Sequence, residues 1–275
     1  MIRRWRLGWR GQSVLVEADR PDTGPFLARF LALDAVAADD AGSAHVVARR
    51  DGSGYRVSVA GQTVHATTLA AARMLLLEAV GHAFVHAGGT TVLHAGAYAV
   101  NGGAVACLGA PRAGKSYLAH AAWCQGRTVL GDDRIALAGL SLAAFPKCLK
   151  LRLDEGIKAA DAVPGGAGSA LFAARHGDDR RAVLARSLPG FAGYGGAYAT
   201  RAVLLIERGR GPRSSLGTIS VADALGQLVP SGTTGMASPM VLVRALKPYA
   251  ESGRLPWLAV GEGDAEGALG LLDRL

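Results

Sequence analysis

LGAPRAGKSYLAHA, residues 108–121, is the stretch that decides the fold. It follows an apolar segment that predicts a strand, and its second half has the composition of a helix. A strand-to-helix corner needs one glycine and a helix cap. This corner has two glycines, a proline and a lysine, so the sequence predicts more than a turn here.

Residues 109–116, GAPRAGKS, match the phosphate-loop pattern G-x-x-x-x-G-K-[ST]. Glycine lets consecutive backbone N–H groups converge on one anion, and the helix that follows adds its N-terminal amides. Lys115 can reach the outer phosphates of a triphosphate, and the Ser116 hydroxyl can bind Mg²⁺. A purely structural turn is the alternative. The residues expected to contact the nucleotide are Gly109, Ala110, Pro111, Arg112, Ala113, Gly114, Lys115, Ser116 and Tyr117.

Two adjacent carboxylates, Asp132 and Asp133, follow the predicted strand RTVLG, 17 and 18 residues after Lys115. A phosphate loop requires a carboxylate on a neighbouring strand to hold its metal ion. A pair can divide the work, since one carboxylate binds Mg²⁺ and the other accepts a proton from an attacking hydroxyl. The sequence leaves the order open. A solvated pair at a strand end is the alternative.

His94-Ala-Gly, the loop GAPRAGKS and the segment GDDRIAL together resemble the catalytic core of the HPr kinase/phosphorylase family. They resemble more closely the stand-alone kinases related to it, some of which accompany gene sets for peptide modification, such as those for lasso peptides. The spacings are 15 residues from His94 to Gly109 and 18 from Lys115 to Asp133. The resemblance covers residues 90–155 and is weaker over 190–275.

The resemblance implies an α/β fold with a P-loop core of the HPr-kinase-like (PEP carboxykinase-like) type. It implies ATP and Mg²⁺ as cofactors, with Lys115 and Ser116 on the phosphates and metal, and Asp132 and Asp133 as metal ligand and general base. His94 would lie beside the transferred phosphoryl group; a packed core histidine is the alternative.

Arg201, which opens the apolar segment TRAVLLIER, resembles the family's arginine before a similar strand and would neutralise transition-state charge. Tyr117 stands where the bifunctional enzymes have an acidic residue, and the family's Arg-Gly-Leu-Gly segment has no clear copy. These departures argue against a phosphorylase activity.

The patterning predicts a small β-rich α+β unit over residues 1–66 and the kinase-like core over 67–275, with an apolar helix over 67–90 between them. An Asn101–Gly102 turn predicts a hairpin before the loop. Residues 156–199 are poorly patterned and are a candidate lid or substrate loop, or disordered. Lys147, Lys150 and Arg152 either face phosphates or form a basic strand edge.

Composition narrows the classes of protein. The net charge is +8, carried mostly by arginine, but no nucleic-acid-binding module is recognisable. Three dispersed cysteines predict neither a disulfide framework nor a zinc site. Charged residues interrupt the apolar region 69–93, and no signal peptide is evident, so we expect a cytoplasmic protein without membrane or nucleic-acid partners. A homo-oligomer is left open.

The leading hypothesis is an ATP- and Mg²⁺-dependent kinase that phosphorylates a hydroxyl, a serine of a peptide or small protein such as a lasso-peptide precursor. One alternative is a kinase of the same fold that acts on a small-molecule hydroxyl. Another is a nucleotide-binding partner protein without catalysis, which would need neither a second carboxylate nor a base.

Overall fold

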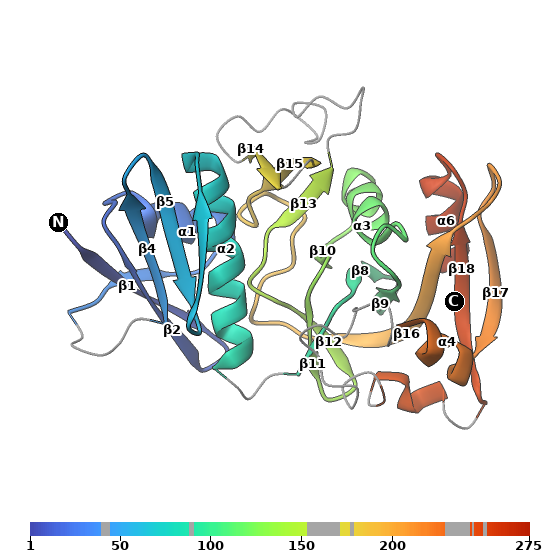
Figure 1. The fold of residues 1–275 in the computed structure, drawn as a ribbon. Helices are drawn as coiled ribbons and strands as arrows, with labels where there is room; N and C mark the ends of the chain where they lie inside the picture. The colour runs from blue at the N-terminus through green and yellow to red at the C-terminus, as the bar shows by residue number, and fades with distance from the viewer. Residues whose placement is uncertain are drawn as a thin grey trace. The chain divides into compact units, whose positions relative to one another are not determined.

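The computed structural model describes residues 1–39, 45–87, 91–152, 171–176, 179–228, 243, 245–249 and 252–275. Over these residues the chain is mixed α/β, with three sheets and few helices (Figure 1). It forms two compact units. Unit 1 consists of Met1–Gly89 and Pro146–Pro189, and unit 2 of Thr90–Phe145 and Gly190–Leu275.

Unit 1 is built on a six-stranded sheet of order β3-β1-β2-β4-β5-β6. Only the β2–β4 pair is parallel among its neighbouring strands. Buried residues alternate along β1, as the period of two in a strand predicts for one buried face, whereas Val14, Leu15 and Val16 of β2 are all buried. The strands are β1 (Arg3–Trp9), β2 (Gln12–Ala18), β3 (Ala35–Ala37), β4 (Val46–Asp51), β5 (Gly54–Val59) and β6 (Gln62–Ala66).

Helix α2 (Leu69–His86) covers this sheet together with the shorter α1 (Thr23–Leu31) (Figure 1). Thr68 caps α2, since its Oγ1 accepts from the N–H of Ala71 at 3.2 Å. Among the helices that the structure describes, α2 is the one whose length and apolar composition would let it cross a membrane. Half of this helix is buried inside the structure. Its packing on the sheet is that of a core helix.

A three-stranded sheet of order β13-β15-β14 also belongs to unit 1. Its strands are β13 (Leu149–Arg152), β14 (Leu171–His176) and β15 (Asp179–Leu184). Phe172 of β14 packs on Phe30 of α1, with ring centroids 5.1 Å apart. Lys147 and Lys150 pair with Glu78 of α2, within unit 1.

Two expectations about organisation are therefore corrected. The predicted boundary between residues 66 and 67 is wrong, because α2 packs against the sheet that precedes it and residues 146–189 return to the same unit. Part of the poorly patterned section 156–199 is the hairpin β14–β15. Residues 185–197 of the same section form turns and loop that lead to β16, and residues 156–170 and 177–178 lie outside the described residues.

Unit 2 contains a nine-stranded sheet whose main path is β10-β8-β9-β16-β12-β11-β7, with β18 beside β16 and β17 beside β18. Neighbours β9, β16 and β18 run parallel. The strands are β7 (Thr91–Leu93), β8 (Gly96–Val100), β9 (Gly103–Leu108), β10 (Val129–Gly131), β11 (Ile135–Ala138), β12 (Ser141–Ala144), β16 (Tyr198–Arg208), β17 (Ser215–Ser220) and β18 (Arg254–Val260).

Helix α3 (Lys115–Cys124) packs beside β8, β10 and α6 (Ala265–Leu272), while α4 (Val221–Leu228) packs beside β17 and β18. A short 3₁₀ helix, η2, spans Lys247–Tyr249. Every residue of β9 is buried, which is why its sequence reads as a continuous apolar run. The predicted hairpin is confirmed: Gly102 has φ +75° in the turn between β8 and β9.

Candidate phosphate-binding site

The pairing of the strands brings the ends of four strands of unit 2 to one edge of the sheet. β9 and β16 are parallel, with Leu108 opposite Leu205, so both end at this edge. The antiparallel β8 begins there, since Gly96 lies opposite Cys107. β10 ends there as well, because Gly131 lies opposite Ala97. The carboxyl ends of parallel strands are where open α/β sheets bind ligands.

The loop after β9 has the backbone of an anion-binding turn. Arg112 has φ +71° and Gly114 φ +106°, and the N–H of Ala113 donates to the carbonyl of Ala110 at 3.1 Å. Alternating right- and left-handed residues turn successive N–H groups toward one point. At Gly109 a Cβ would lie 2.5 Å from the carbonyl oxygen of Ile206, so only glycine lets the loop approach β16 this closely.

Lys115 opens α3 and is buried, with 8% of its surface exposed. Its Nζ donates to the carbonyl oxygens of Gly109 at 2.6 Å and Ala110 at 3.0 Å. Burial lowers the pKa of Lys115 to about 8, although the nearby charge of Asp132 acts to raise it. The lysine therefore holds its charge at a desolvation cost, which an incoming anion would offset.

The two carboxylates in the turn after β10 differ in their exposure to solvent. A Cβ on Gly131 would meet the carbonyl oxygen of Arg134 at 2.7 Å, so glycine permits this tight turn. Asp132 is 4% exposed. The side chain of Asp133 is 26% exposed, and its Oδ1 lies 2.8 Å from Nε2 of His94. β11 pairs antiparallel with β7, and Ile135 lies opposite Leu93. This pairing brings His94, which follows Leu93, close to Asp133.

The oxygen ligands at this edge fit a small hard cation. Mg²⁺ in nucleotide sites is bound by one or two carboxylates and a hydroxyl, with phosphates and water completing its shell. Ser116, in the first turn of α3, supplies a hydroxyl next to the loop. The buried Asp132, which follows β10, supplies a carboxylate. No group of three or more His, Cys, Asp or Glu side chains that could hold a metal by themselves occurs among the described residues.

Arg201 does not belong to this site. It lies next to Thr200, which pairs with Ala104 near the start of β9, and its Nη1 approaches the carbonyl oxygen of Asn101 at 3.4 Å. From Ala104 to Leu108 a strand rises about 13 Å. The expected role in neutralising transition-state charge is therefore wrong, because the exposed guanidinium lies at the hairpin turn, at the opposite end of β9 from the loop.

A carboxylate at the site was missed by sequence reasoning. Glu207, near the end of β16, lines a pocket of about 360 Å³ beside the loop. The signal that could have identified it is a single acidic residue at the carboxyl end of an apolar strand. The other lining residues are Ala110, Pro111, Arg112, Ala113, Leu205, Ile206, Arg208, Gln227 and Leu228.

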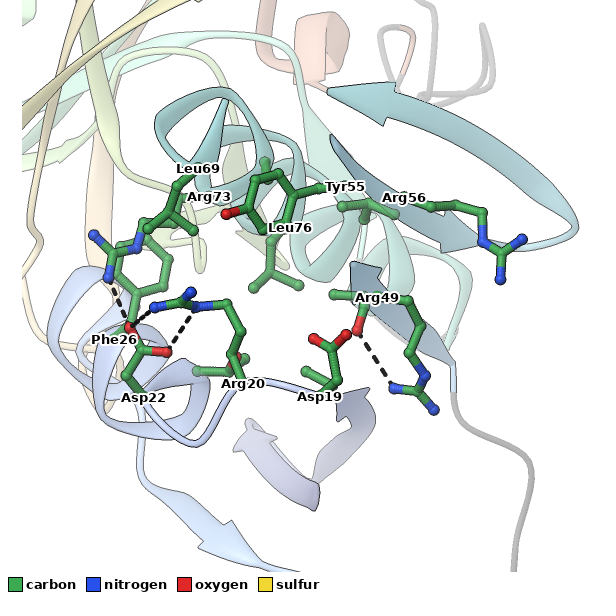
Figure 2. A pocket seen from close by; sticks show the side chains of 15 residues that line it. Asp19, Arg20, Asp22, Phe26, Arg49, Tyr55, Arg56, Leu69, Arg73 and Leu76 are labelled. Atoms are coloured by element: carbon green, nitrogen blue, oxygen red, sulfur yellow. Dashed lines mark hydrogen bonds and ion pairs between the residues drawn. The ribbon is translucent and has the colours of Figure 1, made fainter. Parts of the chain in front are cut away.

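A second pocket, in unit 1, was also unforeseen. Figure 2 shows Arg20 and Arg73 both directed at Asp22, at one side of a pocket lined by α1, α2, β2, β4 and β5. Nε of Arg20 lies 3.0 Å from Asp22 Oδ1, and Nη2 of Arg73 lies 2.9 Å from Oδ2. Arg20, Arg73 and Asp22 at this side of the pocket are thus engaged with one another.

Comparison of the chain with protein-family models and with curated protein sequences finds no match.

Proposed function

We propose that unit 2 is an ATP- and Mg²⁺-dependent phosphotransferase of the HPr-kinase-like type, acting on a serine hydroxyl of a peptide or small protein. The observation that carries the proposal is the common edge of the sheet. The loop of residues 109–116, the buried Asp132 beside Lys115 and the His94–Asp133 pair all lie there.

The two carboxylates suit different tasks. Asp133 is the proposed proton acceptor, because its side chain is partly exposed and His94 orients it at 2.8 Å. Asp132 and Ser116 are the proposed ligands of Mg²⁺, which supplies charge neutralisation at the phosphates when bound. The acceptor oxygen forms a bond to the terminal phosphorus as the bond to the bridging oxygen breaks, ADP leaves, and the hydroxyl proton passes to Asp133.

Lys115 would bind the transferred group. Its Nζ is held by carbonyl oxygens of the loop, so a terminal phosphate that replaced them would also compensate the desolvation of the ammonium. Preorganised charge of this kind in a water-poor site stabilises the developing negative charge of a transition state. The choice of a peptide acceptor rests on the resemblance to stand-alone kinases of peptide-modifying gene sets.

Transfer is tested with ATP and Mg²⁺ and two acceptor sets: peptides translated from open reading frames beside the gene, and glycerol as a simple hydroxyl compound. Mass spectrometry reports the added phosphate. We expect Lys115→Ala to abolish transfer and Asp133→Asn to slow it about 10²- to 10⁴-fold. Arg201→Ala, at the opposite end of β9, is the matched control and is expected to keep the wild-type rate.

The outcomes separate the hypotheses. Phosphate on glycerol but on no peptide would replace the peptide acceptor by a small molecule. Transfer at the full rate by Asp133→Asn would contradict the assignment of the base. ATP binding without transfer to either acceptor set would favour a nucleotide-binding partner protein.

A further inference from the structure

We propose that the pocket beside the loop holds the nucleoside part of the nucleotide, with Glu207 accepting hydrogen bonds from the ribose hydroxyls. The inference rests on the proposed function, because it takes the loop as the site of the phosphates. It adds where the rest of the ligand lies and which side chain recognises it.

The order of the strands gives the direction of the ligand. β9 carries the loop and has β8, then β10, on one side and β16 on the other. Asp132 and Asp133 follow β10, so the terminal phosphate must face that side. The phosphates lead away from the carboxylates across the loop, and the nucleoside therefore lies on the side of β16.

The structure has a pocket on that side. Residues 110–113 of the loop form one wall, Leu205–Arg208 at the end of β16 a second, and Gln227 and Leu228 of α4 a third. Its volume of about 360 Å³ falls within the range of about 300–1,000 Å³ that is usual for small-molecule sites. Apolar walls with a few polar groups are the usual surroundings of a base and its sugar.

Glu207 is the acidic side chain among the residues that line this pocket. Along β16, Val203 and Leu205 belong to the core cluster that includes Leu228 of α4, and Glu207 continues their row two residues further. Its carboxylate forms no hydrogen bond or ion pair with the part of the chain that the structure describes. A partly buried carboxylate in this position can accept hydrogen bonds from a ligand, and the vicinal hydroxyls of ribose supply two donors.

The test compares the binding of three probes in the presence of Mg²⁺ by isothermal titration calorimetry: ATP, 2′,3′-dideoxy-ATP and inorganic tripolyphosphate. We expect Glu207→Gln to weaken ATP about tenfold or more and to leave tripolyphosphate and dideoxy-ATP unchanged. Glu266→Gln is the matched control, because Glu266 is exposed on α6, does not line the pocket and is expected to change nothing.

A second variant tests the pocket without altering its charge. Gln227 is exposed on α4, so Gln227→Trp is expected to fill the pocket, to weaken ATP and to spare tripolyphosphate. ATP affinity unchanged in both variants, or ATP bound no more tightly than tripolyphosphate by the wild type, would overturn the nucleoside pocket. Failure of tripolyphosphate to bind the wild type would overturn the phosphate loop itself, and the inference with it.

Discussion

Two clusters of charged residues, one in each unit, differ in the direction of their pKa shifts. The charged forms are favoured in one cluster and disfavoured in the other. In unit 1, the carboxylate of Asp22 accepts hydrogen bonds from Arg20 at 3.0 Å and from Arg73 at 2.9 Å (Figure 2). The bond from Arg20 holds the pKa of Asp22 below its usual value and raises that of Arg20 itself. In unit 2, Lys115 bonds to carbonyl oxygens of its own loop, and burial lowers its pKa to about 8.

The difference distinguishes the Asp22 cluster, which stabilises the fold, from the candidate anion site at Lys115. Around Asp22 each charged group stabilises the charged form of its neighbours, so the cluster adds to stability without a ligand. At Lys115 burial makes the charged form less favourable than in water, and a bound anion would offset that cost. Unfavourable charge of this kind, in a concave place, is typical of functional sites. Three predictions test the comparison, from the largest effect to the smallest.

The largest effect concerns the pH dependence of unfolding and Lys115. Between pH 8 and 10.5 the unfolded chain holds the lysine proton more firmly than the folded one, so Lys115 by itself contributes a rise in stability with pH over this window. Cys107 and Tyr98, whose pKa values burial raises, contribute a fall with rising pH in the wild type and in the variant alike, so the comparison of the two isolates Lys115. The shift from 10.5 to about 8 corresponds to a rise on the order of 3 kcal/mol. We expect Lys115→Met to lack the rise, as measured by urea unfolding across the window.

The matched control is Lys247→Met, because Lys247 is exposed and should leave the pH profile of the wild type intact. Parallel profiles for the wild type and Lys115→Met would show that Lys115 carries no desolvation cost, and the contrast with Asp22 would disappear.

The second effect concerns the contact between the loop and β16. We expect Gly109→Ala to lower the free energy of unfolding by about 2 kcal/mol, because its Cβ would lie 2.5 Å from the carbonyl oxygen of Ile206. The displaced loop should also bind tripolyphosphate less tightly. Urea unfolding and calorimetry measure the two changes. Gly195→Ala has open space around its Cβ and serves as control; equal effects of the two substitutions would rule out the close approach.

The smallest effect concerns the Asp22 cluster. Asp22→Asn should cost about 1 kcal/mol at neutral pH, a modest value because the Asp22 side chain is 41% exposed and solvent screens its ion pairs. The pKa of Asp22 is lowered from 3.8, so the difference from the wild type should persist above that pH and fade as the pH falls further. Asp34→Asn, at an exposed position, is the control. A difference that grew on acidification would contradict the ion-pair explanation.

The local signals were read correctly from the sequence. The helix that starts at Lys115 and the Asn101–Gly102 turn each depend on a few adjacent residues whose backbone needs are specific. The family itself and the kinase activity stay proposals, and the fold that the structure shows is the coarser mixed α/β class.

The errors arose where the outcome depends on distant partners. Arg201 was assigned to the site from the strand that it opens, but strand pairing decides at which end of β9 it lies. The boundary after residue 66 was wrong because apolar residues lie all round α2, so its sequence does not show which sheet it covers. The hairpin β14–β15 was missed because its strands, LFAARH and DRRAVL, contain three alanines and an aspartate, which have weak strand propensity.

The chain passes from unit 1 to unit 2 after Gly89, returns at Pro146 and leaves again after Pro189. Neither unit is therefore a continuous stretch of polypeptide, and during synthesis unit 1 cannot be completed until residue 189 has emerged from the ribosome. A fragment that begins at residue 90 would retain Cys148 and Phe172 without Phe30, to which both are joined in unit 1. Genetic truncation thus offers no clean separation of the proposed nucleotide site from the rest of the protein, and an isolated unit 2 would need residues 146–189 replaced by a short linker.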